Sequence, residues 1–225
     1  MISTSDCWMT DRCKLSGRCP STCIKLFKLS YLSDQALLSP QQRRHVQLRL
    51  DADLSDKESF SRLKKVELDI ENFVKDGYNL FIHSTNVGNG KTSWSLRLLN
   101  SYLAKIWPTS DLTCRALFVH VPRFFISLKE SFAKASDYVD HIRQNVLTAD
   151  LVVFDEIGVK ALTTFEMEQL LSIVNARLDG GKSSIYTSNL SESEMKESVG
   201  ERLYSRVVNS SVNVELVGVD KRGLV

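Results

Sequence analysis

Apolar residues recur along this chain with two different periods, and the alternation between them predicts most of its secondary structure. Helical spacing starts near residue 56, continues through Phe60, Leu63 and Val66, and ends at Gly77. Short apolar runs then predict strands at 79–84, 116–121, 151–155, 183–189 and 212–217. Between and after them, helical patterns cover 92–107, 122–133, 137–147, 164–181, 191–200 and 201–209. Strands that alternate with helices predict an α/β fold, with a parallel five-stranded sheet covered by helices on both faces.

The front of the chain lacks this alternation, so we expect an N-terminal module at 1–56 and an α/β domain at 57–225. The charge distribution follows the same division. Residues 12–49 carry eight Lys or Arg against one acid, Asp34, although the whole chain has a net charge of only +2. A basic segment on a mildly acidic body suggests an anionic or a protein partner. A solvated basic surface would explain the same pattern.

Within the module, the spacing of Ile24, Phe27 and Tyr31 predicts one apolar stripe on a helix. Aromatic side chains among basic ones also suit single-stranded nucleic acid, which they bind by stacking and charge. For Phe27, Tyr31 and the earlier Trp8, the helical spacing favours packing in the core instead.

Composition indicates a soluble globular protein, with 43% hydrophobic and 25% charged residues. No run approaches the roughly 18 apolar residues of a membrane span, and the first residues do not resemble a secretory signal. We therefore expect a cytoplasmic protein, in which disulfides are disfavoured.

Four of the five cysteines fall close together, at Cys7, Cys13, Cys19 and Cys23. Four thiolates are enough for a tetrahedral Zn²⁺ site, and a metal would supply folding energy to a module too small for a core of its own. The spacing is not the C-x2-C pair of common zinc ribbons, and unrelated reduced thiols are the alternative. The isolated Cys114 is expected to be a small buried hydrophobic residue.

A glycine-rich stretch, "IHSTNVGNGKTSWS", joins the first expected strand to a helix. In that context backbone N–H groups and the helix N-terminus can cradle phosphate. The expected nucleotide-binding residues are Asn86, Val87, Gly88, Asn89, Gly90, Lys91, Thr92 and Ser93. Lys91 would reach the outer phosphates, and Thr92 would bind Mg²⁺. The usual pattern G-x-x-x-x-G-K-[ST] has a glycine where this chain has Thr85, which we expect to alter affinity more than fold.

Two carboxylates end the apolar strand "LVVFDEIG". A strand of this kind paired with a phosphate loop is how P-loop enzymes hold Mg²⁺ and a water. Asp155 would complete the metal shell, and Glu156 would polarise the attacking water. Asn189, at the tip of the next strand, would hold that water if the two strands are neighbours. The alternatives are two acids that cap a buried strand and a simple turn residue.

Four stretches, "NVGNGKTS", "LVVFDEIG", "IYTSNL" and "GERLYSRVVNSSVNVELVGVDKRG", resemble the AAA+ helicase loaders of the DnaC/DnaI type, especially their shorter bacteriophage relatives. The resemblance covers roughly 57–225. It implies a P-loop NTPase domain of AAA+ type without a C-terminal helical lid. A missing lid predicts weak nucleotide binding and slow turnover unless a partner completes the site.

Arginines in the tail of that family reach the nucleotide site of a neighbouring subunit. The resemblance implies that Arg206 acts in trans, that Arg202 assists it, and that Arg222 senses the nucleotide in cis. A surface basic cluster, or salt bridges within the chain, is the alternative.

The resemblance further implies an ATP-dependent loader that self-assembles and places the replicative hexameric helicase on single-stranded DNA. DnaI-type loaders dock through a zinc-binding N-terminal module, which is similar in architecture to the cysteine-rich front here. One alternative is a transposition-helper ATPase, whose family typically begins with helices and not with clustered cysteines. Another is a helicase-binding adaptor or inhibitor without productive ATPase activity, which the intact Lys91, Thr92, Asp155 and Glu156 argue against.

Overall fold

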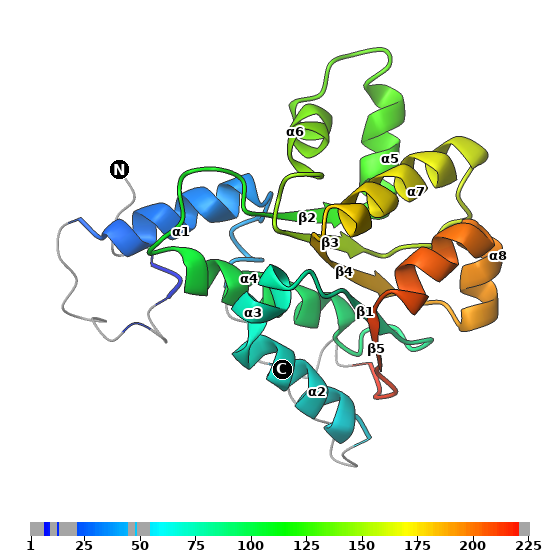
Figure 1. The fold of residues 1–225 in the computed structure, drawn as a ribbon, viewed down its shortest axis with the longest axis horizontal. Helices are drawn as coiled ribbons and strands as arrows, with labels where there is room; N and C mark the ends of the chain where they lie inside the picture. Colours follow the sequence, from blue (N-terminus) through cyan, green and yellow to red (C-terminus); the bar gives the residue numbers. More distant parts are fainter. Residues whose placement is uncertain (1–6, 10–12, 14–21, 45–47, 49–54, 221–225) are drawn as a thin grey trace.

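Five parallel strands form one sheet in the spatial order β2-β3-β4-β1-β5 (Figure 1). This computed structural model describes residues 7–9, 13, 22–44, 48 and 55–220. The strands are β1 (Leu80–His83), β2 (Ala116–His120), β3 (Leu151–Asp155), β4 (Ser183–Ser188) and β5 (Val212–Glu215). The predicted α/β fold with a parallel five-stranded sheet is confirmed. Because β4 lies between β1 and β3, the carboxyl ends of all three strands meet at one edge.

Helices cover both faces of the sheet. On one face lie α1 (Ile24–Gln35), α2 (Lys57–Leu68), α3 (Ile70–Lys75) and α4 (Lys91–Ile106). On the other lie α5 (Val121–Glu130), α6 (Asp137–Asn145), α7 (Thr164–Asp179) and α8 (Glu192–Tyr204), followed by the π-helical turn η3 (Ser205–Asn209). Figure 1 shows the two groups on opposite sides of the strands.

Alternation along each strand divides the core into two clusters. In β1, Leu80 and Ile82 face the cluster under α4, whereas Phe81 faces the cluster under α5 to α8. Successive side chains of a strand point to opposite faces, so a strand buried on both faces is apolar throughout. That is why β1 to β3 are visible in the sequence as continuous apolar runs.

Two helical segments differ in detail from the sequence expectation. The helix expected from 56 to 76 is broken at Asp69, whose φ of −112° and ψ of 25° are not helical, and α2 and α3 result. The two short helices expected at 191–209 are both present, joined by a kink at Gly200 with φ of 76°. The second of them begins inside α8 and continues into η3.

The expected apolar stripe of α1 is wrong as a core-facing stripe. Ile24 is 68% exposed and Phe27 is 58% exposed. The buried face consists of Leu26, Leu29 and Leu32 together with Ser30 and Ser33. Each serine hydroxyl donates to the backbone carbonyl four residues earlier, at 2.7 Å, so the polar group is satisfied inside the helix. The buried face of α1 is therefore not the one that carries Ile24 and Phe27.

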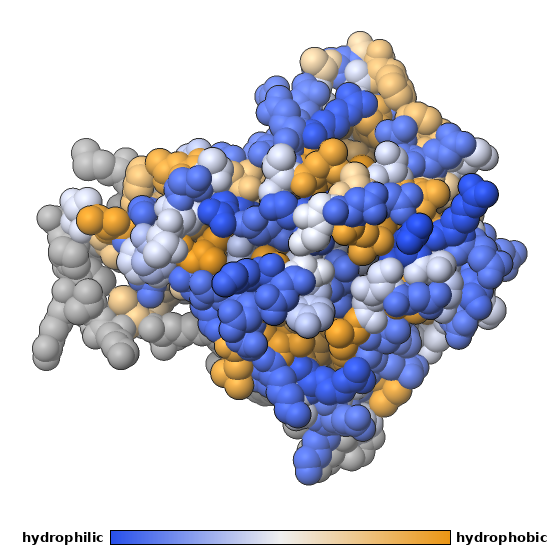
Figure 2. Space-filling view, in the orientation of Figure 1, coloured by the Kyte–Doolittle hydropathy of each residue, from blue (hydrophilic) through white to orange (hydrophobic). Residues whose placement is uncertain are grey.

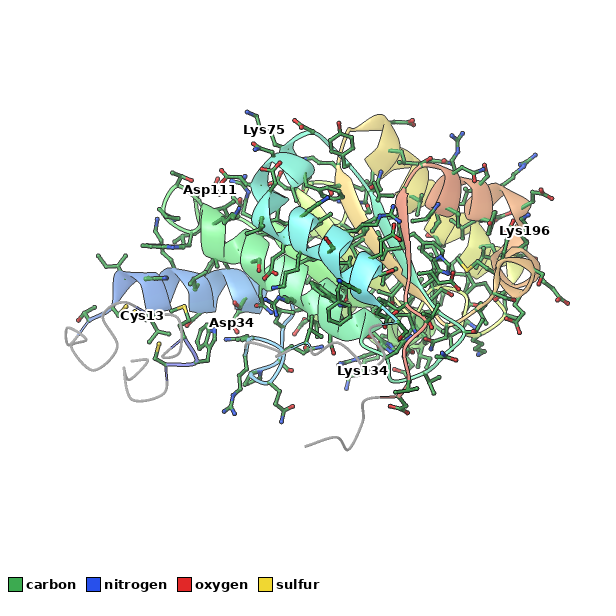
Figure 3. The ribbon with its side chains drawn as sticks, turned by 90° about the horizontal axis from the view of Figure 1, so that it is seen from below. Cys13, Asp34, Lys75, Asp111, Lys134 and Lys196 are labelled. Atoms are coloured by element: carbon green, nitrogen blue, oxygen red, sulfur yellow. The ribbon has the colours of Figure 1, made fainter. Side chains whose placement is uncertain are left out.

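Helix α1 shares the core of the α/β domain. It packs against α4 and β2, and the carbonyl of Ala36 accepts a hydrogen bond from the N–H of Phe118 at 2.9 Å. Trp8 is partly buried against the same cluster. Seen from below, α1 lies along α4, with Cys13 beside it and Lys196 at the far end of the molecule (Figure 3). The division of the chain at residue 56 stays a prediction.

Among the described helices, none has both the length and the apolar character that crossing a membrane requires.

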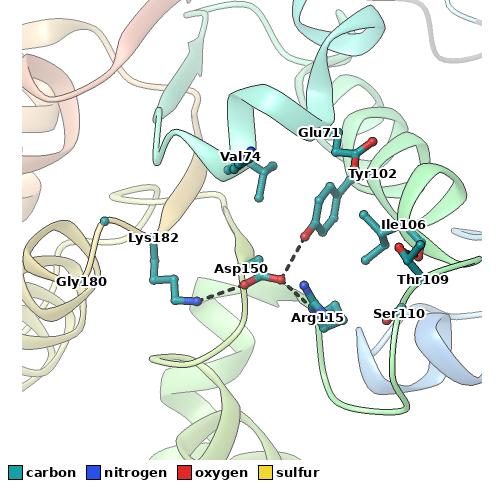
Figure 4. A pocket seen from close by; sticks show the side chains of 12 residues that line it. Glu71, Val74, Tyr102, Ile106, Thr109, Ser110, Arg115, Asp150, Gly180 and Lys182 are labelled. Atoms are coloured by element: carbon teal, nitrogen blue, oxygen red, sulfur yellow. Dashed lines mark hydrogen bonds and ion pairs between the residues drawn. The ribbon is translucent and has the colours of Figure 1, made fainter.

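A polar cavity of about 370 Å³ lies at the amino ends of the strands, away from the phosphate loop (Figure 4). Its centre is the carboxylate of Asp150, just before β3. Lys182 donates to Oδ1 at 3.0 Å, while Arg115 Nε and the Tyr102 hydroxyl donate to Oδ2 at 2.6 and 3.0 Å. Arg115 precedes β2, Lys182 precedes β4 and Tyr102 lies on α4. The cluster therefore ties three strands to one helix.

Replacing Asp150 with Asn should lower the free energy of unfolding by roughly 1–3 kcal/mol at pH 7, as expected for hydrogen bonds to a charged group. Burial raises the pKa of Asp150, but the hydrogen bonds from Lys182 and Arg115 outweigh it, and the pKa lies below its usual value. The stabilisation is therefore complete above about pH 4 and is lost as the pH falls through the lowered pKa.

Urea unfolding of both proteins at pH 7 and pH 3 measures this difference. The matched control is Asp111→Asn, because Asp111 also faces Arg115, at 3.5 Å, but its side chain is 62% exposed. That variant should change stability by less than about 0.5 kcal/mol. Equal stability of Asp150→Asn and the parent protein at pH 7 would show that the cluster does not stabilise the fold.

Candidate nucleotide-binding site

The phosphate loop connects β1 directly to α4. Gly88 has φ of 73°, and Gly90, at the N-cap of α4, has φ of 107°. Both are left-handed conformations that favour glycine. Thr85 is different, because Leu37 and Glu156 are the only described non-glycine residues with positive φ. The missing glycine of the usual pattern therefore imposes no left-handed strain here.

Gly88 is also needed for a close approach. A Cβ atom built on Gly88 would overlap the carboxylate of Asp220, so the tail of the chain lies directly against the tip of the loop. A Cβ on Gly90 would meet only Leu48, at 3.7 Å. Of the two glycines, Gly88 is therefore the one whose substitution would force a neighbour, the side chain of Asp220, to move.

The side chain of Lys91 is folded into the loop. Its Nζ donates to the backbone carbonyl of Asn86 at 2.6 Å and to Oδ1 of Asn89 at 3.1 Å, and the residue is buried. An ammonium group held in the loop is in place to meet a phosphate. Loop position Val87, in contrast, is 52% exposed.

The two residues predicted to bind Mg²⁺, Thr92 and Asp155, lie within hydrogen-bonding distance of each other. Thr92 Oγ1, in the first turn of α4, donates to Oδ1 of Asp155 at 3.0 Å. Ser93 follows it in the same turn. Asp155 ends β3 and is 2% exposed. A hydroxyl and a carboxylate oxygen at this separation suit Mg²⁺, which prefers oxygen ligands, so both residues fit the expected metal.

The tip of β4 completes this edge. Thr187 Oγ1 donates to the same Asp155 oxygen at 2.8 Å and accepts from the N–H of Glu156 at 3.0 Å. Strands β3 and β4 are neighbours, which is the condition on which the expected role of Asn189 depends. Glu156 itself has φ of 61°, a conformation that costs a non-glycine residue about 1–3 kcal/mol and is concentrated at functional sites.

His120 was not among the residues that sequence reasoning selected. It ends β2, and its Nε2 lies 3.1 Å from Oε2 of Glu156. Its Nδ1 accepts from the N–H of Arg123 at 3.3 Å and caps α5. A neutral ring in that tautomer donates from Nε2 to Glu156. The signal was available, because His120 ends a strand at the same edge as Asp155.

Burial raises the pKa of Asp155, and the neighbouring charge of Glu156 raises it further, while hydrogen bonds from the hydroxyls of Thr187 and Thr92 lower it. The net direction is upward. The free site therefore holds a carboxylate whose charged form is disfavoured, and a cation bound beside it would favour the charged form.

Four predicted positions remain: Asn189, Arg202, Arg206 and Arg222. Asn189 directly follows β4. Arg202 and Arg206, on α8 and η3, are exposed and have no ion pair within the described part of the chain. Arg222 lies outside the described residues.

The cysteine cluster does not form a metal site in the part of the chain that is described. Cys7, Cys13 and Cys23 are half-buried free thiols, and no three metal-ligating side chains meet among the described residues. Cys23 Sγ instead accepts from the N–H of Leu26 at 3.4 Å and caps α1. Cys19 lies outside the described residues. Cys114 is buried, as expected, and burial raises its pKa to about 11.

A phosphate loop after β1, an Asp–Glu pair at the end of β3 and a polar tip on the strand between them are the arrangement of the P-loop NTPase fold, here with the AAA+ strand order. No protein-family model matches this chain. The sequence is 24% identical to the replicative helicase loader DnaC of Escherichia coli K12 over 127 residues, which are 56% of this chain and 49% of that protein. The chain therefore matches about half the length of this curated relative.

Solved structures agree on the fold. The crystal structure of the DnaC helicase loader superposes with a TM-score of 0.61 and 18% identity, over 75% of this chain and 93% of that one. DnaI gives a TM-score of 0.60 at 17% identity, over 82% and 94%. AMPPCP-bound DnaA from Aquifex aeolicus gives 0.54 at 20% identity, over 74% and 48%. The resemblance to AAA+ helicase loaders of the DnaC/DnaI type is thus confirmed, while the bacteriophage detail stays a prediction.

Replacing Asp155 with Asn should stabilise the nucleotide-free protein while removing Mg²⁺-dependent nucleotide binding. A raised pKa means that the carboxyl stabilises the fold below its unfolded pKa, near 3.9, and loses that contribution as the pH rises through the folded value. At pH 7 the charge is therefore a cost. Asn keeps Oδ1 for both threonine hydroxyls, and the melting temperature should rise by about 2–4 °C, equivalent to ~1 kcal/mol.

Differential scanning fluorimetry without nucleotide, and again with Mg²⁺ and ATP, checks both parts. Exposed Asp137 at the start of α6 provides the control variant Asp137→Asn, which should keep the nucleotide-induced shift. A melting temperature of Asp155→Asn below that of the parent protein would contradict the electrostatic interpretation.

Proposed function

We propose that this protein is an ATP-dependent loader of a replicative DNA helicase, with ATP hydrolysis acting as its switch. The ATPase part rests on one observation: the Thr92 hydroxyl and an Asp155 carboxylate oxygen are 3.0 Å apart at the edge that also carries Lys91 and Glu156. The loader part rests on the similarity to DnaC and DnaI. ATP as the nucleotide is supported by DnaA, a structural neighbour bound to the ATP analogue AMPPCP.

The chemistry divides among a few side chains. Lys91 would bind the outer phosphates, and Thr92 with Asp155 would hold Mg²⁺, whose charge offsets that of the transferring phosphoryl group. Glu156 would accept the proton of the attacking water, and Asn189 would orient that water. His120 Nε2 lies 3.1 Å from Oε2 of Glu156 in the free protein, so the other carboxylate oxygen, Oε1, would be the one that accepts the proton.

Self-assembly is supported by exposed side chains near the end of the chain. Arg202 and Arg206 project from α8 and η3 without ion pairs to the described residues. A fixed arginine from a neighbour can stabilise the charge that develops on the phosphoryl group.

Exposed apolar side chains also gather around α5, where Ile126 is 57% and Phe132 is 69% exposed (Figure 2). Apolar surface of this kind is common at protein contacts.

The helicase-binding part is assigned to the N-terminal region. Helix α1 exposes Ile24 and Phe27, with Lys25 and Lys28 beside them. A rim of lysines around apolar side chains suits a partner surface that is apolar and acidic. Zinc at the cysteine cluster remains part of the proposal, and the intact protein's metal content tests it.

Native mass spectrometry of this protein mixed with the hexameric helicase of its host, with ATP and with ADP, tests the function. A complex of defined ratio that depends on the nucleotide is expected. The isolated protein in the same instrument gives its zinc content. Self-assembly on DNA, with no helicase complex in either nucleotide, would replace this proposal with the transposition-helper function.

Replacing Glu156 with Gln should trap bound ATP and stabilise the oligomer. Gln cannot accept the proton, so single-turnover hydrolysis should fall by about 10²–10⁴-fold, while nucleotide affinity stays within about threefold. Filter binding and native mass measure the two quantities. Glu168→Gln on α7 is the matched control, because Glu168 is exposed and lies outside the site. If Glu156→Gln left hydrolysis and assembly unchanged, the switch mechanism would be wrong.

Replacing Arg206 with Ala should reduce the ATPase rate of the assembled protein by about 10³-fold without changing nucleotide affinity in the monomer. Mixing Arg206→Ala with Lys91→Ala should restore part of the rate. At mixed interfaces the intact site of the first variant meets Arg206 of the second. Arg202→Ala, on the same surface, should have the smaller effect. A mixture as inactive as its components would mean that Arg206 does not act in trans.

A further inference from the structure

The segment after β5 runs between the start of α2 and the phosphate loop. The N–H groups of Val217 and Gly218 donate to the two carboxylate oxygens of Asp56, at 2.7 and 3.1 Å. The carbonyls of the same two residues accept from Nδ2 of Asn86, at 2.9 and 3.3 Å. Residues 216–220, which we call the tail strap, are therefore bonded on one side to Asp56 and on the other to the loop.

Asp56 is an unusual residue at this position. It is the N-cap residue of α2, where an aspartate normally accepts from the first N–H groups of its own helix. Here its side chain makes no such bond, and both oxygens are directed to the strap. The residue is only 1% exposed, and a carboxylate buried to that extent needs strong donors.

The first turn of α2 also holds the end of β5, just before the strap. Ser59 Oγ donates to the carbonyl of Glu215, at the end of β5, at 2.6 Å. Figure 3 shows β5 passing beside α2. Two side chains of one helical turn thus fix the path of the chain as it leaves the sheet, and Asp56 provides the charged one.

From the strap, hydrogen bonds continue to the lysine of the loop. Asn89 Nδ2 donates to the carbonyl of Leu216 at 3.0 Å, and Asn89 Oδ1 accepts from Lys91 Nζ at 3.1 Å. Asn86, which holds the strap with its side chain, accepts from Lys91 Nζ with its carbonyl at 2.6 Å. The asparagines therefore connect the strap to the group that would meet the phosphates.

We propose that Asp56 is a positioning residue of the nucleotide site, which acts by fixing the tail strap against the phosphate loop. The proposal rests on the proposed function, since it assumes that the loop binds nucleotide. Removing Asp56 frees the strap, the asparagines lose ordered partners, and Lys91 loses its fixed place. The coupling is reciprocal, so nucleotide binding should in turn hold the strap more firmly.

Two measurements on the full-length protein test the proposal. The first is the affinity for a fluorescent ATP analogue with Mg²⁺. The second is hydrogen exchange of the amides of Val217 and Gly218, with and without that nucleotide. Asp56→Ala should weaken nucleotide binding by about 10-fold, the lower end of the loss seen when a residue that orients a metal ligand is removed. Asp56→Asn retains one acceptor and should show a smaller loss. In both variants the two amides should exchange faster.

The matched control is Asp69→Ala. Asp69 is the N-cap residue of α3, also without a side-chain cap bond, but it is exposed and lies outside the strap. It should leave affinity and strap exchange unchanged. A variant on the other side of the contact, Val217→Pro, removes one donor, and Val217→Ala is its control because that side chain is 50% exposed. In the Asp56→Asn protein, Val217→Pro should weaken nucleotide binding by a smaller factor than it does in the parent protein.

The outcomes separate the two proposals. If the parent protein does not bind the nucleotide, the proposed function fails. If it binds, and Asp56→Ala and Val217→Pro bind the nucleotide as well as the parent protein although the amide of Gly218 exchanges faster in both, the positioning role of Asp56 is overturned while the proposed function stands. Unchanged exchange of the strap in both variants would also overturn it. Weaker binding together with faster exchange, absent in Asp69→Ala, supports it.

Discussion

The buried carboxylate of Asp155 is the group on which the candidate nucleotide-binding site depends. One of its oxygens receives two hydroxyl groups, from Thr92 on α4 and from Thr187 on β4. That oxygen therefore ties the helix after the loop to two neighbouring strands. Because burial disfavours its charge, the arrangement is one that the free protein holds at a cost and that a bound cation would relieve. Stability and the proposed binding of Mg²⁺ are therefore opposed at this residue.

Much of the candidate site could be predicted from the sequence, because the strands that end at it are buried on both faces of the sheet and are apolar throughout. The carboxyl ends of such strands must meet at one edge, and this rule alone places Asp155 and Glu156 beside the loop. His120 follows the same logic and was missed only because no second residue of a motif accompanied it. The roles of Arg202, Arg206 and Asn189 stay predictions, because they concern a water, a nucleotide or a neighbour.

Other features could not be predicted, because the same residue types serve two purposes. Ser30 and Ser33 look polar in the sequence, but each satisfies its hydroxyl within α1 and becomes part of the buried face. Asp56 looks like an ordinary helix start, and its partners, Val217 and Gly218, are 161 and 162 residues away. A contact of that separation leaves no periodic signal. The site is thus a local motif whose support comes from a distant part of the chain.

The order of these segments along the chain has a consequence for biosynthesis. Asn89 of the loop and Leu216 of the tail strap are 127 residues apart, and β5, which flanks β1, is the last strand of the sheet to be made. At about 5–20 residues per second, the loop leaves the ribosome roughly 6–25 s before its support. A nascent chain therefore carries a glycine-rich loop without the strap that orders it. On the proposed function, the chain would become able to bind nucleotide only after the final strand has been translated.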